Sequence, residues 1–364
     1  MQIFFEKRKS LSRRALILVP IISFIVALLL GAILLALTGV NPIVTYRAMA
    51  RGAFGSVYAL SETLVVAIPL MLTGLGVAIA FRMRFWNIGA EGQLVFGGIA
   101  GAGVALHFSE IIPGYLLLPA VLVAGMIAGA IWAGIPAALK AYLGVDETLT
   151  SLMLNYVAIL FSSYLYYGAW RDPMGFGFPG TARFVEEAWL PRLFGRAHYG
   201  LFFAVIAAVL LWFIFNRTRW GFELKIIGEN ETAAKYLGIK IASNIVLALL
   251  LSGALSGLAG ASQVTGIYRR LQTGLAAGYG YTAIIIAWLA QLNPIAVLFV
   301  SVLMGALYVG GDQVQMMMGL PSAVGLVLQG LILFPMLAGT LFTEYRLRII
   351  RPQKSQSVES EAAS

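Results

Sequence analysis

The amino-acid sequence predicts an all-α integral membrane protein with about ten transmembrane helices, arranged as two inverted-topology halves with broken helices near the centre. The first observation is composition: the 364 residues are 60% hydrophobic and 11% charged, with a mean hydropathy of +0.87. Soluble domains carry about 25% charged residues. The second is a series of long apolar runs, and the third is the uneven placement of lysine and arginine between them.

The apolar runs define the expected helices in order along the chain. A hydrocarbon core of about 30 Å needs about 20 helical residues. Suitable runs occupy residues 15–38, 60–80, 88–108, 113–139, 149–168, 199–216, 241–263 and 320–342. Two shorter runs, 281–292 and 294–311, lie between the last two of these.

The basic residues predict the orientation of these spans. With the N-terminus in the cytoplasm, 17 of the 25 lysines and arginines fall inside and eight outside, as the positive-inside rule expects. Both termini are therefore expected to be cytoplasmic. This topology divides the chain into a cytoplasmic N-terminus (1–14), one transmembrane domain (15–342) and a partly disordered tail (343–364). The domain consists of two halves (15–168 and 199–342) and contains an outer loop (169–198) and an inner loop (216–240).

Composition also excludes several kinds of function. The net charge of +9 comes from basic residues that flank apolar spans, so we expect a membrane surface and not a nucleic acid as their partner. The chain has no cysteine and two histidines at unrelated positions, so no metal site, cofactor or thiol chemistry is expected. The sequence also shows no pairing of a nucleophile with a base that would indicate an enzyme.

Five spans per half is an odd number, so a duplicated half would be inverted in the membrane. The run Thr282–Leu292 is bounded by Gly280 and Pro294 and covers only about half of the hydrocarbon core. A short segment interrupted by glycine predicts a discontinuous helix beside a central site.

Polar residues at the start of the third span, Asn87, Glu91 and Gln93, form the first candidate site. In one interpretation Glu91 is stabilised by the N-terminal end of its helix and neutralised by Arg82 or Arg84. In the other, the three side chains face a central polar path. At about 100° per residue Glu91 and Gln93 point in different directions unless the helix is broken.

Three further residues belong to this candidate path. Asn155 falls inside the fifth span, where it either bridges helices or contacts substrate. Tyr279 and Tyr281 border the short eighth segment, where they either stack on a planar ligand or mark the membrane interface.

The inner loop contains a compact helix signal in GFELKIIGENETAAKYLGIK. Asn230 is suited to cap a short helix, Glu231 suits its positive end, and Gly238 fits a left-handed position after it. We expect about two turns of helix, either as a capped connector or as a docking helix for a cytoplasmic partner.

Five motifs in order resemble the permease subunits of ABC importers of the branched-chain amino acid/ribose permease family. Within it the chain is similar to the nucleoside-type branch, which works with basic membrane lipoproteins. The motifs are NIGAEGQ (87–93), LTSLMLNY (149–156), GxNxxAAxxxGI (228–239), SGALSGLAG (252–260) and GYGYTAI (278–284).

The resemblance implies a dimer of permease subunits in the bacterial cytoplasmic membrane, with separate ATPase subunits inside and a substrate-binding lipoprotein outside. The chain has no GxxxxGK[ST] phosphate loop, so it is not itself the ATPase. By position, the ATPase-coupling residues would be Gly228, Asn230, Ala233, Ala234, Gly238 and Ile239. Arg171, Arg183, Arg192 and Arg196 would pair with acidic residues of the lipoprotein, or are solvated loop charges.

The expected activity is uptake of a nucleoside without covalent chemistry. One alternative keeps the machinery and changes the cargo to a simple sugar or another small polar solute. The other is an ion-coupled secondary transporter that uses Glu91 as a proton or sodium site.

Overall fold

The computed structural model describes residues 2–7, 13–319 and 345–350, together with the pairs 327–328, 330–331, 334–335 and 338–339. These residues form two units, one from Met1–Pro42 with Val327–Ser364 and the other from Ile43–Leu326. Most of the predicted last span (320–342) and the tail after residue 350 lie outside the described residues.

The first unit contains α1 (Arg13–Leu37) and two strands that the all-α prediction missed. Strand β1 (Gln2–Lys7) pairs antiparallel with β4 (Tyr345–Ile350), so Gln2 lies opposite Ile350. The sequence YRLRII alternates polar and apolar residues, which is the period of a strand. The partner is more than 300 residues away, so only this local alternation was available to indicate it.

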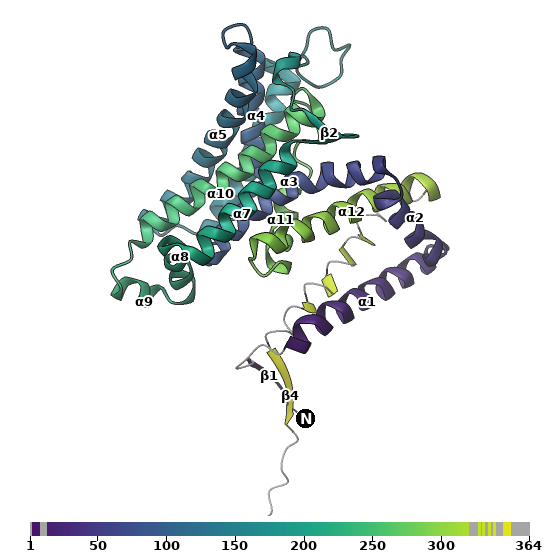
Figure 1. Ribbon diagram of the computed structural model, residues 1–364, viewed down its shortest axis with the longest axis vertical. Helices are drawn as coiled ribbons and strands as arrows, with labels where there is room; N and C mark the ends of the chain where they lie inside the picture. Colours follow the sequence, from purple (N-terminus) through teal and green to yellow (C-terminus); the bar gives the residue numbers. More distant parts are fainter. Residues whose placement is uncertain are drawn as a thin grey trace, which may run out of the picture. The chain divides into compact units, whose positions relative to one another are not determined.

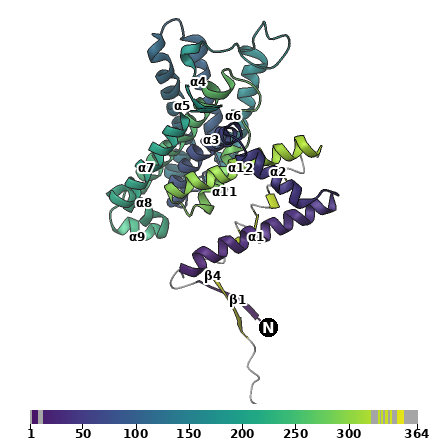
Figure 2. The same ribbon diagram turned by 45° about the vertical axis from the view of Figure 1, so that its right-hand side comes forward.

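The second unit is built of helices joined mostly by short connections (Figures 1 and 2). They are α2 (Pro42–Phe54), α3 (Val57–Arg82), α4 (Ala90–His107), α5 (Gly114–Leu143), α6 (Glu147–Tyr164) with the π-helical turn η1 (Leu165–Ala169), α7 (Gly200–Arg217), α8 (Arg219–Glu229), α9 (Glu231–Tyr236), α10 (Ile241–Gln263) with the π-helical turn η3 (Val264–Tyr268), α11 (Tyr279–Leu289) and α12 (Pro294–Met318).

Six of the described helices are long and apolar enough to span a membrane, or up to seven when α1 and α2 are counted together as one span. The chain is therefore a multi-pass membrane protein, while the count of ten and the inverted halves stay predictions. Helix α2 was not predicted. Helix α11 has 11 residues, or about 16 Å of helix, which confirms the expected short segment.

The core of the second unit is α10, which packs against α3, α4 and α5. Glycines at the crossing allow the backbones to touch: a methyl group on Gly257 would overlap the carbonyl of Gly125, and one on Gly129 would overlap Gly253. Gly97 of α4 meets Gly257 from the other side. Small residues at these crossings therefore allow the helices to pack closely.

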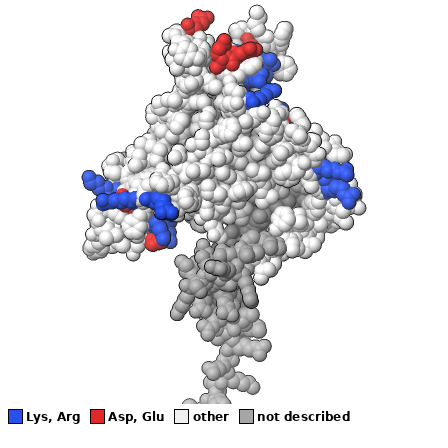
Figure 3. Space-filling model, in the orientation of Figure 1, with Lys and Arg blue, Asp and Glu red and all other residues white. Residues whose placement is uncertain are grey.

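Charged side chains mark the ends of the second unit. On the face drawn in Figure 3, lysine and arginine gather at the end that carries α8 and α9, and charges of both signs gather at the opposite end. The surface between them on this face is mainly uncharged, apart from a basic group at one side. An apolar band between charged ends is the surface that a membrane-spanning domain requires.

The predicted outer loop is folded against the end of α10. It holds the short turn η2 (Glu186–Ala188) and the antiparallel strands β2 (Arg192–Phe194) and β3 (Ala197–His198). Three backbone N–H groups of the loop donate to the segment after α10: Thr181 to Leu271 (2.9 Å), Phe184 to Arg269 (2.9 Å) and Leu190 to Thr265 (3.3 Å). The sequence predicted a loop here but did not indicate these short elements or their hydrogen bonds.

His198 anchors the outer loop from the inside. Its side chain is 0% exposed, its Nδ1 accepts from the backbone N–H of Gly200 (3.2 Å), and its ring lies against Gly266 of η3. Burial lowers the pKa of His198 from 6.5 to about 4. The packed imidazole is therefore neutral at physiological pH.

We expect the stability of the outer loop to fall as the pH is lowered from 7 to 5. Between pH 6.5 and about 4 the unfolded state takes up a proton at His198 and the folded state does not. The stability that neutral His198 contributes is thus complete above pH 6.5 and decreases by about 1.4 kcal/mol for each pH unit below it. The melting temperature of the detergent-solubilised protein, compared between pH 7 and pH 5, measures this loss of stability.

The matched variants are His198→Gln, which should remove most of this pH dependence, and His107→Gln, which should keep it because His107 is exposed. An equal pH dependence in the wild type and His198→Gln would contradict the assignment.

Candidate functional site

The first candidate site is a junction at which the N-termini of α4 and α11 meet. Glu91 lies in the first turn of α4 and is 1% exposed. Its Oε1 accepts from the backbone N–H of Gly278 (2.8 Å) and its Oε2 from that of Gly280 (2.5 Å). These N–H groups begin α11 and have no acceptor within their own helix.

This geometry explains why a carboxylate is tolerated in the interior. The negative charge of Glu91 sits in the first turn of its own helix and caps a second one, so the positive ends of two helix dipoles surround it. Gly280 makes the approach possible, because any side chain there would overlap the backbone of Glu91. The helix-end interpretation of Glu91 is thus confirmed, with a partner that the sequence did not indicate.

The expected neutralisation by arginine is wrong. Within the described part of the chain no ion pair involves Glu91. Arg82 instead lies over the ring of Phe215 at 4.2 Å, and Arg84 is exposed. Backbone N–H groups perform the role that the sequence suggested for the guanidinium groups.

Asn87 and Gln93 form a separate arm of the junction. The Gln93 amide donates to Asn87 Oδ1 (3.0 Å), and Asn87 Nδ2 donates to Ser252 Oγ on α10 (3.0 Å). Asn87 Oδ1 also accepts from the N–H of Gly89 (3.1 Å), which fixes the turn before α4. As the helical geometry predicted, Gln93 and Glu91 point to different partners.

Asn155 ties α6 to the same place. Its Oδ1 accepts from the N–H of Gly92 (2.8 Å), and its Nδ2 donates to the carbonyl of Ile88 (2.9 Å) and to the hydroxyl of Tyr281 (3.3 Å). The interpretation of Asn155 as a bridge between helices is confirmed. Its amide is engaged on both sides, so it supports α4 and α11.

The two tyrosines of α11 differ in exposure. Tyr279 is buried, whereas Tyr281 is 36% exposed. Asn87, Glu91, Gln93 and Asn155 are each at most 1% exposed. The junction is therefore a braced polar core with Tyr281 at its accessible edge. Ser252 and the amides of Gly278 and Gly280 were missed, because they lie far along the chain.

The second candidate site is the element α8–α9, at the opposite end from the outer loop (Figure 1). Asn230 Oδ1 accepts from the N–H of Ala233 (3.0 Å), and Gly238 follows α9 with φ +73°. The predicted cap and left-handed glycine are both confirmed. Ala234 is fully buried against this chain and Ala233 is half-buried, so these small residues shape the element from within.

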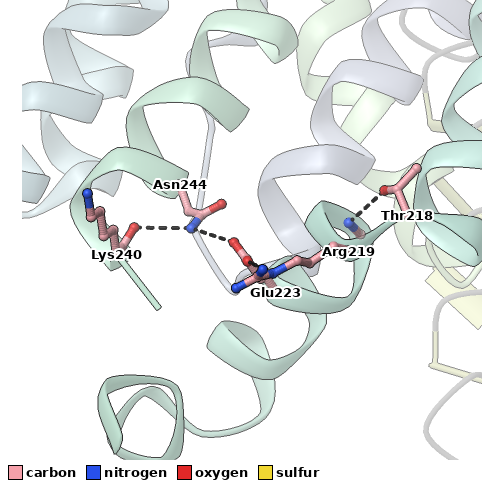
Figure 4. A network of polar contacts seen from close by, with 6 residues as sticks. Thr218, Arg219, Glu223, Lys240 and Asn244 are labelled. Atoms are coloured by element: carbon pink, nitrogen blue, oxygen red, sulfur yellow. Dashed lines mark hydrogen bonds and ion pairs between the residues drawn. The ribbon is translucent and has the colours of Figure 1, made fainter. Parts of the chain in front are cut away.

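A polar network holds the base of this element to α10 (Figure 4). Arg219 Nε donates to Glu223 Oε1 (3.1 Å) and Asn244 Nδ2 donates to Glu223 Oε2 (3.2 Å). The same Asn244 amide reaches the carbonyl of Lys240 (3.1 Å), and Thr218 Oγ1 caps the start of α8. Both ends of the predicted coupling loop are thus fixed.

The outward side of α9 presents apolar side chains to solvent. Tyr236 is 89% exposed and Leu237 is 64% exposed. Exposed apolar residues beside charged ones are typical of a protein contact surface. Both residues stand in the motif GxNxxAAxxxGI (228–239), at positions where the motif specifies no residue type.

The outer arginines are not equivalent. Arg171, Arg183 and Arg192 are exposed, whereas Arg196 pairs with Glu62 of α3 (3.0 Å). The backbone N–H of Arg196 also donates to Ser61 Oγ (3.2 Å). Arg196 therefore ties the loop to α3, and the other three are available to a partner.

Comparison with known proteins agrees with this architecture. A family model described as the permease component of branched-chain amino acid transport systems matches residues 59–337. The chain is 35% identical over 355 residues to a glucose ABC transporter permease of Haloferax volcanii, covering 94% of this chain and 93% of the relative.

Two further relatives have nucleosides in their names. A guanosine ABC transporter permease of Bacillus subtilis is 35% identical, over 87% of this chain and 92% of its own. A nucleoside ABC transporter permease of Lactococcus lactis is 31% identical, over 95% of this chain and 96% of its own.

We expect Glu91→Gln to destabilise the junction. The amide keeps the shape but offers one acceptor oxygen to two N–H donors, so a buried N–H group is left without a partner at a cost of about 1–3 kcal/mol. The charge facing two helix ends is lost as well. Thermal melting of the purified protein in detergent should show a lower midpoint.

Glu110→Gln is the matched control, because Glu110 is exposed and the same change should leave the melting midpoint in place. Equal midpoints for Glu91→Gln and the wild type would show that the junction does not need the carboxylate.

Proposed function

We infer the function of this chain from the family to which it belongs, the permease components of branched-chain amino acid transport systems. We propose that it is the membrane-spanning subunit of an ATP-driven ABC importer and that its cargo is a nucleoside. The observation that carries the proposal is similarity over nearly the whole chain to two nucleoside-type permeases. Such subunits are transport components, and the subunit itself is not an enzyme.

The coupling element supports the ATP-driven mechanism. The α8–α9 segment is fixed at its base and exposes Tyr236 and Leu237 at its tip. A cytoplasmic ATPase subunit would contact this tip and push on the helices behind it. The chain lacks a phosphate loop of its own, so hydrolysis belongs to that partner.

The same proposal includes a second permease subunit, a substrate-binding lipoprotein and the topology of the chain. Two permease subunits, identical or homologous, would enclose the path in a bacterial cytoplasmic membrane, with both termini inside. A substrate-binding lipoprotein would dock outside on Arg171, Arg183 and Arg192. About ten spans would form two inverted halves, and the meeting of the N-termini of α4 and α11 is an arrangement that such repeats place near the membrane centre.

Within the junction, Tyr281 is our proposed cargo contact. Its ring is the exposed one among the six predicted path residues, and its hydroxyl accepts a hydrogen bond from Asn155. An aromatic face stacks readily on a planar base. Asn155 holds Tyr281, and Asn87, Glu91 and Gln93 hold the helix ends in position.

A sugar is the second candidate cargo, because the Haloferax volcanii relative is a glucose transporter by name. Ion coupling through Glu91 has less support. Both carboxylate oxygens already accept backbone N–H groups, which leaves Glu91 as a structural anion.

We expect reconstituted vesicles that contain the permease, its ATPase and its binding protein to import guanosine when ATP is supplied on the ATPase side. Uptake should persist with an ionophore present and should exceed glucose uptake at least tenfold. Preferential uptake of glucose would show that the cargo is a sugar and not a nucleoside. Uptake that continues without ATP hydrolysis and stops with the ionophore would contradict the mechanism.

We expect Tyr236→Asp to uncouple the transporter, because it puts a charge on the apolar tip of α9. Tyr236 is exposed, so the variant should fold and insert normally. Transport and the stimulation of ATP hydrolysis by loaded binding protein should each fall at least tenfold.

The exposed Tyr115→Asp, in the first turn of α5, is the matched control and should retain both activities. Undiminished transport by Tyr236→Asp would contradict the docking role of α9.

A further inference from the structure

A cleft of about 540 Å³ lies beside the coupling element. Its walls come from the turn after α3, the adjoining ends of α5 and α6, the α8–α9 segment and the start of α10. Six charged residues line it: Arg84, Lys140, Glu147, Glu229, Glu231 and Lys235. The cleft is therefore polar and continuous with the element that we propose contacts the ATPase.

All but one of these charges have an ion-pair partner within the described part of the chain. Lys140 pairs with Glu147 (2.7 Å) and Lys235 with Glu231 (2.9 Å). Glu229 lies 3.7 Å from Lys225, which is outside the cleft. Arg84 is exposed and is the cation left over. Arg84 is therefore the charged side chain of the cleft that is available to bind an anionic group of a partner.

The backbone at Arg84 has a conformation that costs free energy for any residue other than glycine. Helix α3 ends with the N–H of Arg84 donating to the carbonyl of Phe81 (2.9 Å) and that of Phe85 to Ala80 (3.2 Å). This is a Schellman motif, whose left-handed position is usually glycine. Arg84 occupies it with φ +57°, a conformation that disfavours a residue with a β-carbon.

The same turn is in direct contact with the coupling element. Gly228, near the end of α8, packs on the last turn of α3 so closely that a methyl group would overlap the carbonyl of Arg82. Arg84 is thus two residues from the place where α8 rests on α3.

We propose that Arg84 and its cleft form a second docking point for the ATPase, with Arg84 binding a carboxylate on the ATPase surface beside the site of α9. This inference rests on the proposed role of the subunit in an ABC importer. The exposed tip of α9 favours a protein as the occupant. Glu147, Glu229 and Glu231 also line the cleft, and their carboxylates repel the phosphate of an anionic lipid. A protein surface can place cations opposite these carboxylates, beside the carboxylate that binds Arg84.

The test uses Arg84→Gly, which separates docking from folding. Glycine suits the left-handed position better than arginine, so the variant should melt at the same temperature as the wild type or higher. Its affinity for the purified ATPase subunit of the same transporter, measured by titration onto the permease in lipid nanodiscs, should fall about tenfold. Arg84→Lys should recover part of the affinity, because it restores the charge.

Arg217→Ala is the matched control, since Arg217 is exposed at the same end of the second unit and outside the cleft. It should bind the ATPase as the wild type does. An equal loss with Arg217→Ala, or wild-type affinity with Arg84→Gly, would overturn the inference. A loss seen only in nanodiscs of anionic lipid would assign Arg84 to a headgroup and would also overturn it. If the wild-type permease itself binds no ATPase, the proposed function fails instead.

Discussion

The Glu91 carboxylate is the interaction on which the arrangement of the second unit depends. Two backbone N–H groups from the start of α11 converge on it, at 2.8 and 2.5 Å. A short helix such as α11 has little stability of its own, and its first N–H groups need acceptors when they are buried. Glu91 supplies them, while the ends of two helix dipoles stabilise its charge.

The surrounding polar groups brace this contact from the other helices. Asn87 reaches α10 through Ser252, and Asn155 joins α6 to the turn before α4. Gly228 of the coupling element rests on Arg82, at the end of α3 that leads into this turn. The segment from Arg82 to Glu91 therefore contacts the coupling element at one end and the start of α11 at the other. This places the two candidate sites in one continuous packed region.

Local sequence patterns predict those features that depend on residues close together in the chain. Asn230 and Gly238 signal the ends of α9 by their chemistry, and the short apolar run bounded by Gly280 and Pro294 signals the short helix α11. The partner of Glu91 lies 187 residues away, so the sequence suggested nearby arginines in its place. The pairing of β1 with β4 is distant for the same reason.

The exposure of side chains distinguishes residues that the sequence motif alone does not. Ala234 stands in the coupling motif but faces its own chain, and Tyr236 in the same motif faces solvent. The sequence indicates Arg84 only as a neighbour of Glu91, because nothing local reveals a left-handed arginine at a position that usually holds glycine. Such positions become visible once backbone angles are known.

The most direct measurement of the central contact is amide hydrogen exchange of the segment that contains Gly278 and Gly280 in the wild-type protein. If Glu91 accepts both N–H groups, this segment should exchange as slowly as the buried middle of α10. Exchange as fast as that of the exposed outer-loop residues 174–178 would contradict the account, because the start of α11 would then lack its buried acceptor.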